Sequence, residues 1–212
     1  VVSGYSTFIA SGWLVPILKA SLAGTAFYTP VLVFSLTSVA LLSGAIFGAI
    51  IYLIAFLPLH DKPNFAIRSL IATLAINIAT VQFLLWSFGP RQKALPKLFG
   101  FGRIDFLDFS IRYDQAATII GTLLLVGFML LWFRNSRIGL EIRAMMQNPE
   151  GAALSGISIR RRALPVMMLT GSLAGMAAIL LSQTSFFSPT AGALPLIKGL
   201  TIALLGGLGS VA

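Results

Sequence analysis

The chain has 212 residues, of which 57% are hydrophobic and only 10% are charged. Soluble domains carry about 25% charged residues, so this composition excludes a soluble globular protein and indicates a membrane protein. The formal net charge of +9 does not indicate nucleic-acid binding, because the arginines and lysines lie in the breaks between apolar runs, where the positive charge of cytoplasmic loops explains them. The absence of cysteine excludes disulfides and thiolate metal sites.

Apolar runs along the chain predict the membrane-spanning helices. A spanning helix needs roughly 20 mostly apolar residues. Four runs meet this requirement, at residues 31–57, 66–88, 115–133 and 163–187. Two weaker candidates are residues 1–18, which are diluted by serine, glycine and proline, and residues 192–212, which are interrupted by Pro195 and Lys198. We therefore predict an all-α, polytopic transmembrane fold that forms a single domain over residues 1–212.

Arginine placement predicts the orientation in the membrane. The segment 134–162 contains two glutamates and the arginines Arg134, Arg137, Arg143, Arg160, Arg161 and Arg162, which gives a net charge of +4. This segment is therefore predicted to be cytoplasmic. By alternation, the loop 89–114 is external, with a net charge of +2 from five basic and three acidic residues.

The ionisable residues indicate which chemistry the chain lacks. The single histidine and all the carboxylates fall in predicted loops: His60, Asp61, Asp105, Asp108, Asp114, Glu141 and Glu150. Ion-driven carriers place an ionisable group at membrane depth, and intramembrane proteases need paired carboxylates or a metal cluster there. We therefore predict no catalytic, cofactor-binding or metal-binding residue, and no enzyme. The phosphate-loop motif GxxxxGK[ST] is also missing, so a pump built on this chain takes its energy from another subunit.

A short helix is predicted at residues 149–155, inside the arginine-rich segment. Asn148 is a favoured N-cap, Pro149 suits the first helical position, and Glu150 lies where the helix dipole favours negative charge. Gly156 can adopt the left-handed conformation that ends a helix.

So short a helix must dock on another surface, because isolated helices below about 12 residues are marginal in water. The small side chains of Ala152 and Ala153 allow a partner to approach closely. The alternative is an ordinary interfacial helix between two spans.

Several motifs together resemble a known family. The stretch "SRIGLEIRAMMQNPEGAALSGISIRR" at 136–161 resembles the cytoplasmic loop of branched-chain amino-acid ABC transporter permeases of the LivH type. Similar stretches are "LIATLAINIATVQFLLWSFGP", "LTGSLAGMAAILL" and "SPTAGALPLIKGLTIALLGGLGS", so that the resemblance covers residues 52–212. In this family the chain has another N-terminal helix and continues past "LGGLGSVA", so we expect the sequence to be incomplete at both ends.

The resemblance implies that 149–155 is the coupling helix, which transmits ATP-driven movement from an ATP-binding subunit to the membrane helices. Residues expected to contact that subunit are Arg143, Asn148, Glu150, Ala152, Ala153, Gly156 and Arg160. For the three consecutive arginines, anionic lipid headgroups are an alternative partner.

The implied partners are a second homologous permease, two ATP-binding subunits that hold ATP and magnesium, and an extracellular or periplasmic substrate-binding protein. The implied location is the bacterial inner membrane, with the lipid bilayer around the spans. No cofactor is expected on this chain.

A polar stripe is predicted to line the path of the solute. Ser69, Thr73, Asn77 and Thr80 share one face of a helix, and polar groups that face lipid are costly. The alternative is interhelical hydrogen bonding, while Gly171 and Gly175 indicate close helix packing. The resemblance implies leucine, isoleucine or valine as solute. Urea, short amides, other amino acids and an ion-coupled carrier or channel remain alternatives.

Overall fold

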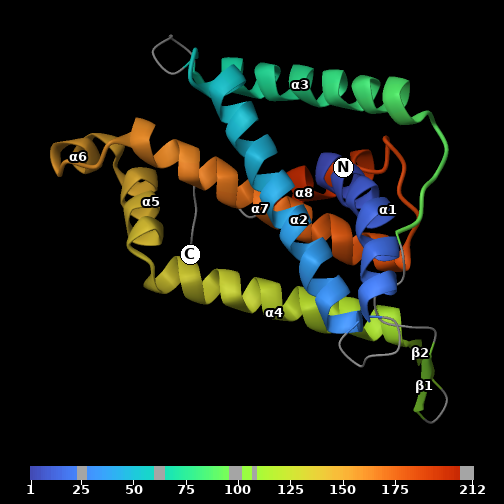
Figure 1. The fold of residues 1–212 in the computed structure, drawn as a ribbon. Helices are drawn as coiled ribbons and strands as arrows, with labels where there is room; N and C mark the ends of the chain where they lie inside the picture. The colour runs from blue at the N-terminus through green and yellow to red at the C-terminus, as the bar shows by residue number, and fades with distance from the viewer. Residues whose placement is uncertain (23–27, 60–64, 96–101, 107–108, 206–212) are drawn as a thin grey trace.

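The structure, a computed structural model, describes residues 1–22, 28–59, 65–95, 102–106 and 109–205. Within these residues it consists of helices and one short hairpin (Figure 1). In chain order the elements are α1 (Val2–Leu22), α2 (Tyr28–Ile51), the π-helical η1 (Tyr52–Phe56), α3 (Phe65–Phe88), β1 (Arg103–Phe106), β2 (Phe109–Arg112), α4 (Tyr113–Asn135), α5 (Arg137–Gln147), α6 (Pro149–Leu154), α7 (Ile159–Thr184) and α8 (Ala193–Leu205).

Four helical segments are long and apolar enough to cross a membrane, and they coincide with the four predicted spans. They are Pro30–Phe56, Ile67–Phe88, Tyr113–Asn135 and Arg162–Thr184. The all-α polytopic prediction is thereby confirmed. Of the weaker candidates, α1 is a helix of 21 residues that contains Pro16. The 13 described residues of α8 extend about 20 Å, which is less than the roughly 30 Å hydrocarbon core.

The closest helix pair is formed by α2 and α7, which cross at glycines. A Cβ atom on Gly44 would overlap the carbonyl oxygen of Gly171, and a Cβ atom on Gly171 would overlap that of Gly44. Gly48 lies equally close to the carbonyl of Met167, and Gly175 to that of Ala40. The predicted packing role of Gly171 and Gly175 is confirmed. Small residues spaced by four allow such backbone contact in membrane helices.

The helix α1 packs on this pair through small hydroxyl side chains. Ser3, Thr7 and Ser11 repeat every four residues and are buried. The hydroxyls of Thr7 and Ser11 donate back to carbonyl oxygens of α1, Thr7 to Ser3 at 2.5 Å and Ser11 to Phe8 at 2.7 Å. Since these two donors are satisfied within the helix, they can be buried at the packed face. This explains how a segment diluted by polar residues still packs inside the bundle.

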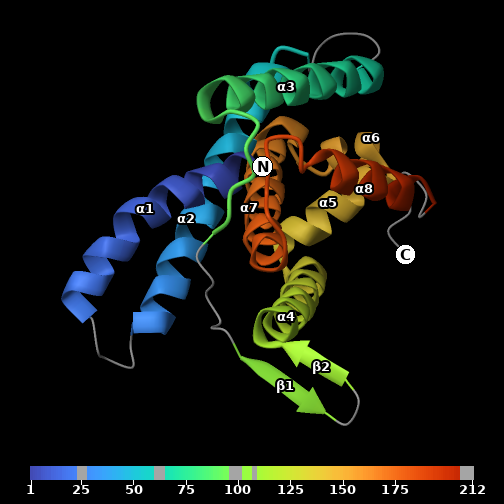
Figure 2. The ribbon, with the colours of Figure 1, turned by 90° about the vertical axis from the view of Figure 1, so that its right-hand side faces the viewer.

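Figures 1 and 2 show how the remaining spans surround the α2–α7 crossing. The helix α4 runs beside α7, and the Thr118 hydroxyl donates to the carbonyl of Leu180 at 3.4 Å. The helix α3 lies on the other side of the crossing. The helices α5 and α6 lie at the end of the molecule opposite to the β1–β2 hairpin.

The outer surfaces of α3 and α4 are apolar. Only 6% of the most apolar stretch of α3 and 0% of that of α4 is buried within the chain. Exposed apolar surface of this extent is unfavourable in water. These faces are therefore suited to lipid or to other membrane subunits.

A hairpin that the sequence analysis did not predict lies in the loop 89–114. The strands β1 and β2 pair antiparallel, with Arg103 opposite Arg112 and Asp105 opposite Ser110. Each strand has four residues, so the pattern is too short to be recognised in the sequence. The hairpin lies outside the spans and leaves the membrane part all-α.

Candidate functional site

A cavity of about 510 Å³ lies between the start of α1, the helices α2, α3 and α7, and the segment that leads into the start of α8. Three residues of the predicted polar stripe, Thr73, Asn77 and Thr80, contribute to its wall. Ser69 precedes them on α3 and is not among the lining residues. The structure therefore brings three of the four predicted path residues to one cavity, which is of the size usual for ligand sites.

The opposite wall comes from α2 and α7. Met167, Thr170 and Gly171 of α7 line the cavity, and Gly44 and Gly48 contribute from α2. The glycines that bring the two helices together thus also leave backbone, rather than side chains, in this part of the wall.

The sequence analysis missed the hydroxyl residues Ser3, Thr170 and Thr190, which also line the cavity. Of these three, Thr170 has a sequence feature that could have pointed to it, because it directly precedes Gly171, a glycine of the helix-packing pair. No polar stripe marks it, since its helical neighbours on that face are apolar or glycine.

Hydrogen bonding distinguishes the two interpretations of the polar stripe on α3, which are lining of a cavity and hydrogen bonding between helices. The Thr73 hydroxyl donates to the carbonyl of Leu70 at 2.9 Å, within its own helix. Across the cavity, the Thr170 hydroxyl donates to carbonyl oxygens of its own helix at 3.1 Å. The Asn77 amide has no hydrogen-bond partner among the described residues. Within the described part of the chain, interhelical hydrogen bonds therefore do not account for Thr73 or Asn77, and the arrangement favours a lining role for both.

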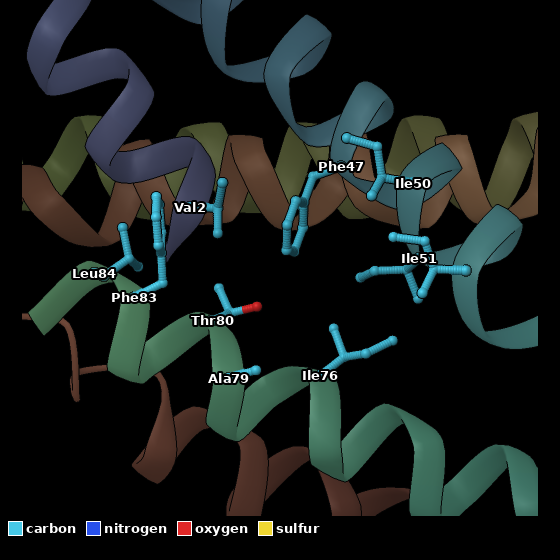
Figure 3. A pocket seen from close by; sticks show the side chains of 10 residues that line it. Val2, Phe47, Ile50, Ile51, Ile76, Ala79, Thr80, Phe83 and Leu84 are labelled. Carbon is cyan, nitrogen blue, oxygen red and sulfur yellow. The ribbon is translucent and has the colours of Figure 1, made fainter. Parts of the chain in front are cut away.

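A second, apolar cavity of about 380 Å³ adjoins the first (Figure 3). Both cavities share Thr80, Phe47 and Ile51 among their lining residues. Thr80 is the one polar residue of the ten that line the second cavity, and its oxygen points into the space between α3 and α2. The two cavities form a largely aliphatic surface with a few hydroxyls and one amide.

The cavity walls are electrostatically neutral. Among the residues that the structure describes, no side chain that lines either cavity is a carboxylate, a histidine, a lysine or an arginine. A neutral wall in a low-dielectric environment disfavours a solute with net charge and tolerates a neutral or zwitterionic one. It also lacks an ionisable group that could bind and release a driving ion.

A second feature, the short helix α6, lies at the end formed by α5 and α7. The Asn148 side chain accepts a hydrogen bond from the Gly151 amide at 3.0 Å, as an N-cap does. At the other end Gly156 has a φ of +82°, and the Ile157 amide donates to the carbonyl of Ala152 at 3.0 Å. Helix α6 is therefore defined at both ends by the residues that its sequence predicts.

The faces of α6 differ in exposure. Ala152 is buried, with 5% exposed, and Ala153 is exposed. Leu154 is 91% exposed, which leaves an apolar side chain uncovered at the tip of the molecule. Of the residues predicted to contact a partner, the side chains of Glu150 and Arg160 lie outside the described part of the chain.

Arg143, another predicted contact residue, binds within its own chain. Its guanidinium donates to the carbonyl oxygens of Phe133 at 3.5 Å and Arg134 at 3.1 Å, which end α4. Its Nε atom also donates to the carbonyl of Gly139 at 3.4 Å. A cation at the last carbonyls of a helix is favourable, so Arg143 fixes α5 against the end of α4.

The spans, the neutral cavity and the exposed short helix together define a class: a multi-pass helical membrane protein with an uncharged internal site. The chain matches the family model described as "Branched-chain amino acid transport system / permease component" over residues 2–212. The chain belongs to this family.

Three similar proteins have names that match the description of this family. The chain is 34% identical over 172 residues to the "Probable branched-chain amino acid transport permease protein LivH" of Methanocaldococcus jannaschii, covering 76% of this chain and 53% of the relative. It is 27% identical over 187 residues to the BraD permease protein of a high-affinity branched-chain amino acid transport system in Pseudomonas aeruginosa, covering 86% and 60%. The corresponding LivH protein of Escherichia coli is 28% identical over 177 residues, covering 81% and 57%.

The chain thus spans between 53% and 60% of the length of these relatives. No solved structure is detectably similar to it.

Proposed function

We propose that this chain is the membrane-spanning subunit of an ATP-driven importer for branched-chain amino acids. The observation that carries the proposal is the neutral, largely aliphatic cavity that Asn77, Thr73 and Thr170 line, in a chain of this permease family. An aliphatic side chain matches the wall, and the few polar groups match a zwitterionic backbone. The carriage of leucine, isoleucine or valine follows from the names of the relatives.

In this proposal, ATP is hydrolysed by partners and not by the chain itself. Two ATP-binding subunits hold ATP and magnesium, a second homologous permease completes the path, and an external binding protein delivers the solute. The end with α5 and α6 faces the cytoplasm of a bacterial cell, across the inner membrane. The excess of arginine near that end supports this orientation. The exposed Leu154 on α6 supports docking of an ATP-binding subunit there.

Reconstitution tests the proposed function directly. The full-length permease, its ATP-binding subunits and its binding protein are placed in vesicles, and uptake of radiolabelled leucine is measured. Uptake is expected with ATP, and no uptake with a non-hydrolysable analogue, because the cavity wall has no ionisable group for ion coupling. Excess isoleucine and valine are expected to compete, whereas urea and acetamide are not.

Three controls belong to this experiment. The permease alone is tested under imposed proton and sodium gradients. Uptake that persists without ATP and follows one of these gradients would establish an ion-coupled carrier instead. Competition by urea or acetamide alone would assign the chain to a related importer with another solute.

The lining role of Asn77 is tested by replacing it with leucine. We expect leucine uptake to fall about tenfold, since the solute loses a polar partner in the cavity. The matched control is Gln82→Leu, because Gln82 is an exposed amide on the same helix and does not line the cavity. If Asn77→Leu assembles normally and transports at the wild-type rate, the cavity is not the path.

A further inference from the structure

An ion pair joins α5 to the start of α7. The Arg162 Nε atom lies 2.5 Å from Glu141 Oε2, and its Nη2 atom donates to Oε1 at 2.9 Å. The pair therefore consists of one charge-assisted hydrogen bond, from Nη2 to Oε1, and a close charge contact between Nε and Oε2. The Glu141 side chain is 21% exposed and that of Arg162 41%, so the pair is partly shielded from water.

The helix α5 is attached to its other neighbours as well. Arg143 holds it to the end of α4, and the Ser136 side chain caps its start by accepting from the Ile138 amide at 3.3 Å. At its other end, Asn148 is at once the C-cap of α5 and the N-cap of α6. The helices α5 and α6 thus meet at a single residue.

The chain segment that connects α6 directly to α7 is less firmly held than the contacts of α5. It consists of residues 155–158, which are not helical and contain Gly156 in the left-handed conformation. Such a segment can change its backbone angles when α6 is displaced, as hinge segments do. Among the described residues, the pair of Glu141 and Arg162 is therefore the direct side-chain connection from α5 to α7, beside the indirect route through α4.

The helix α7 carries part of the cavity wall. Arg162 lies eight residues before Thr170, a rise of about 12 Å along the helix. The glycine crossing couples α7 to α2, whose Gly44 and Gly48 also line the cavity. Movement of the start of α7 is thereby passed to two walls of the cavity.

We propose that Glu141 and Arg162 form the strut that makes α7 move with the α5–α6 unit, so that a push on α6 reaches the cavity. Both are positioning residues, since neither lines the cavity. The inference rests on the proposed function, in which an ATP-binding subunit supplies the push. Its particular consequence is that loss of the pair separates ATP hydrolysis from transport.

The test is the number of leucine molecules imported per ATP hydrolysed by the complete reconstituted importer. In Arg162→Gln and Glu141→Gln we expect this ratio to fall about fivefold or more, with assembly and ATP hydrolysis retained. In the charge-swapped variant Glu141→Arg with Arg162→Glu, the ratio is expected to recover toward the wild-type value. Arg162→Lys is expected to be intermediate, because an ammonium group keeps the charge but lacks the planar guanidinium that presents two nitrogens to the carboxylate.

Arg137→Gln is the matched control. It removes an exposed arginine from the start of α5, the helix that carries Glu141, and should leave the ratio of leucine to ATP unchanged. An unchanged ratio in both single variants overturns the strut. If the single variants fail to assemble, the charge-swapped variant decides: recovery of coupled uptake supports the strut, and failure to recover overturns it. A wild-type importer without ATP-driven uptake refutes the proposed function itself, which distinguishes that failure from failure of the strut alone.

Discussion

Replacing Gly171 with valine is expected to remove most of the folded protein. The Cβ atom alone would overlap the carbonyl oxygen of Gly44 in α2, so the two helices must separate. Overpacking of this kind costs about 3 kcal/mol, and the collision is with backbone, which cannot change rotamer to make room. The yield of monodisperse permease after detergent extraction, and its thermal unfolding temperature, are the measurements.

The matched control is Gly127→Val on α4. A Cβ atom at Gly127 meets nothing within 4 Å, although the glycine lies in an equally apolar span. We expect the yield and unfolding temperature of this variant to match the wild type. Equal behaviour of the two valine variants would show that the α2–α7 crossing does not limit stability.

Replacing Leu154 with aspartate is expected to release the ATP-binding subunits while leaving the permease folded. Leu154 is 91% exposed on α6, so the change costs the isolated chain little. An apolar anchor that is buried at an interface contributes about 2 kcal/mol or more, which corresponds to roughly a thirtyfold weaker complex. Copurification of the ATP-binding subunits with tagged permease measures the loss.

Gly156→Val is expected to reduce copurification of the ATP-binding subunits to a similar extent, for a different reason. A β-branched residue at a φ of +82° is strained, so the end of α6 changes direction and Leu154 moves with it. Leu140→Asp serves as the control, because Leu140 is an exposed leucine on the neighbouring helix α5. Undiminished copurification in both α6 variants would argue against docking at this helix.

The features that depend on local sequence were predictable. A run of about 20 apolar residues has few alternatives to a membrane helix, so the four spans agree with the structure to within a few residues at most ends. The ends of α6 follow from Asn148 and Gly156, whose capping preferences act within one turn. The helical stripe of Thr73, Asn77 and Thr80 likewise follows from the period of a helix.

Features that depend on contacts between distant residues were not predictable. The strut joins residues 21 positions apart, and nothing in the segment 134–162 indicates which arginine meets Glu141. Thr170 enters the cavity because of how α7 crosses α2, which is a property of the packed pair. Arg143 was expected to face a partner, yet its nearest acceptors are the free carbonyls of α4, which a sequence pattern does not reveal.

The glycine crossing also bears on how solute preference can diverge among permeases of this kind. Where the glycines of α2 meet those of α7, the cavity wall is main chain, and any larger residue there forces the helices apart. Mutation therefore has little freedom to reshape that side without loss of the protein. Under the proposed function, adaptation to a new cargo acts on the lining side chains outside this crossing, and Asn77 and Thr190 are the polar positions at which selection for altered transport should first leave its mark.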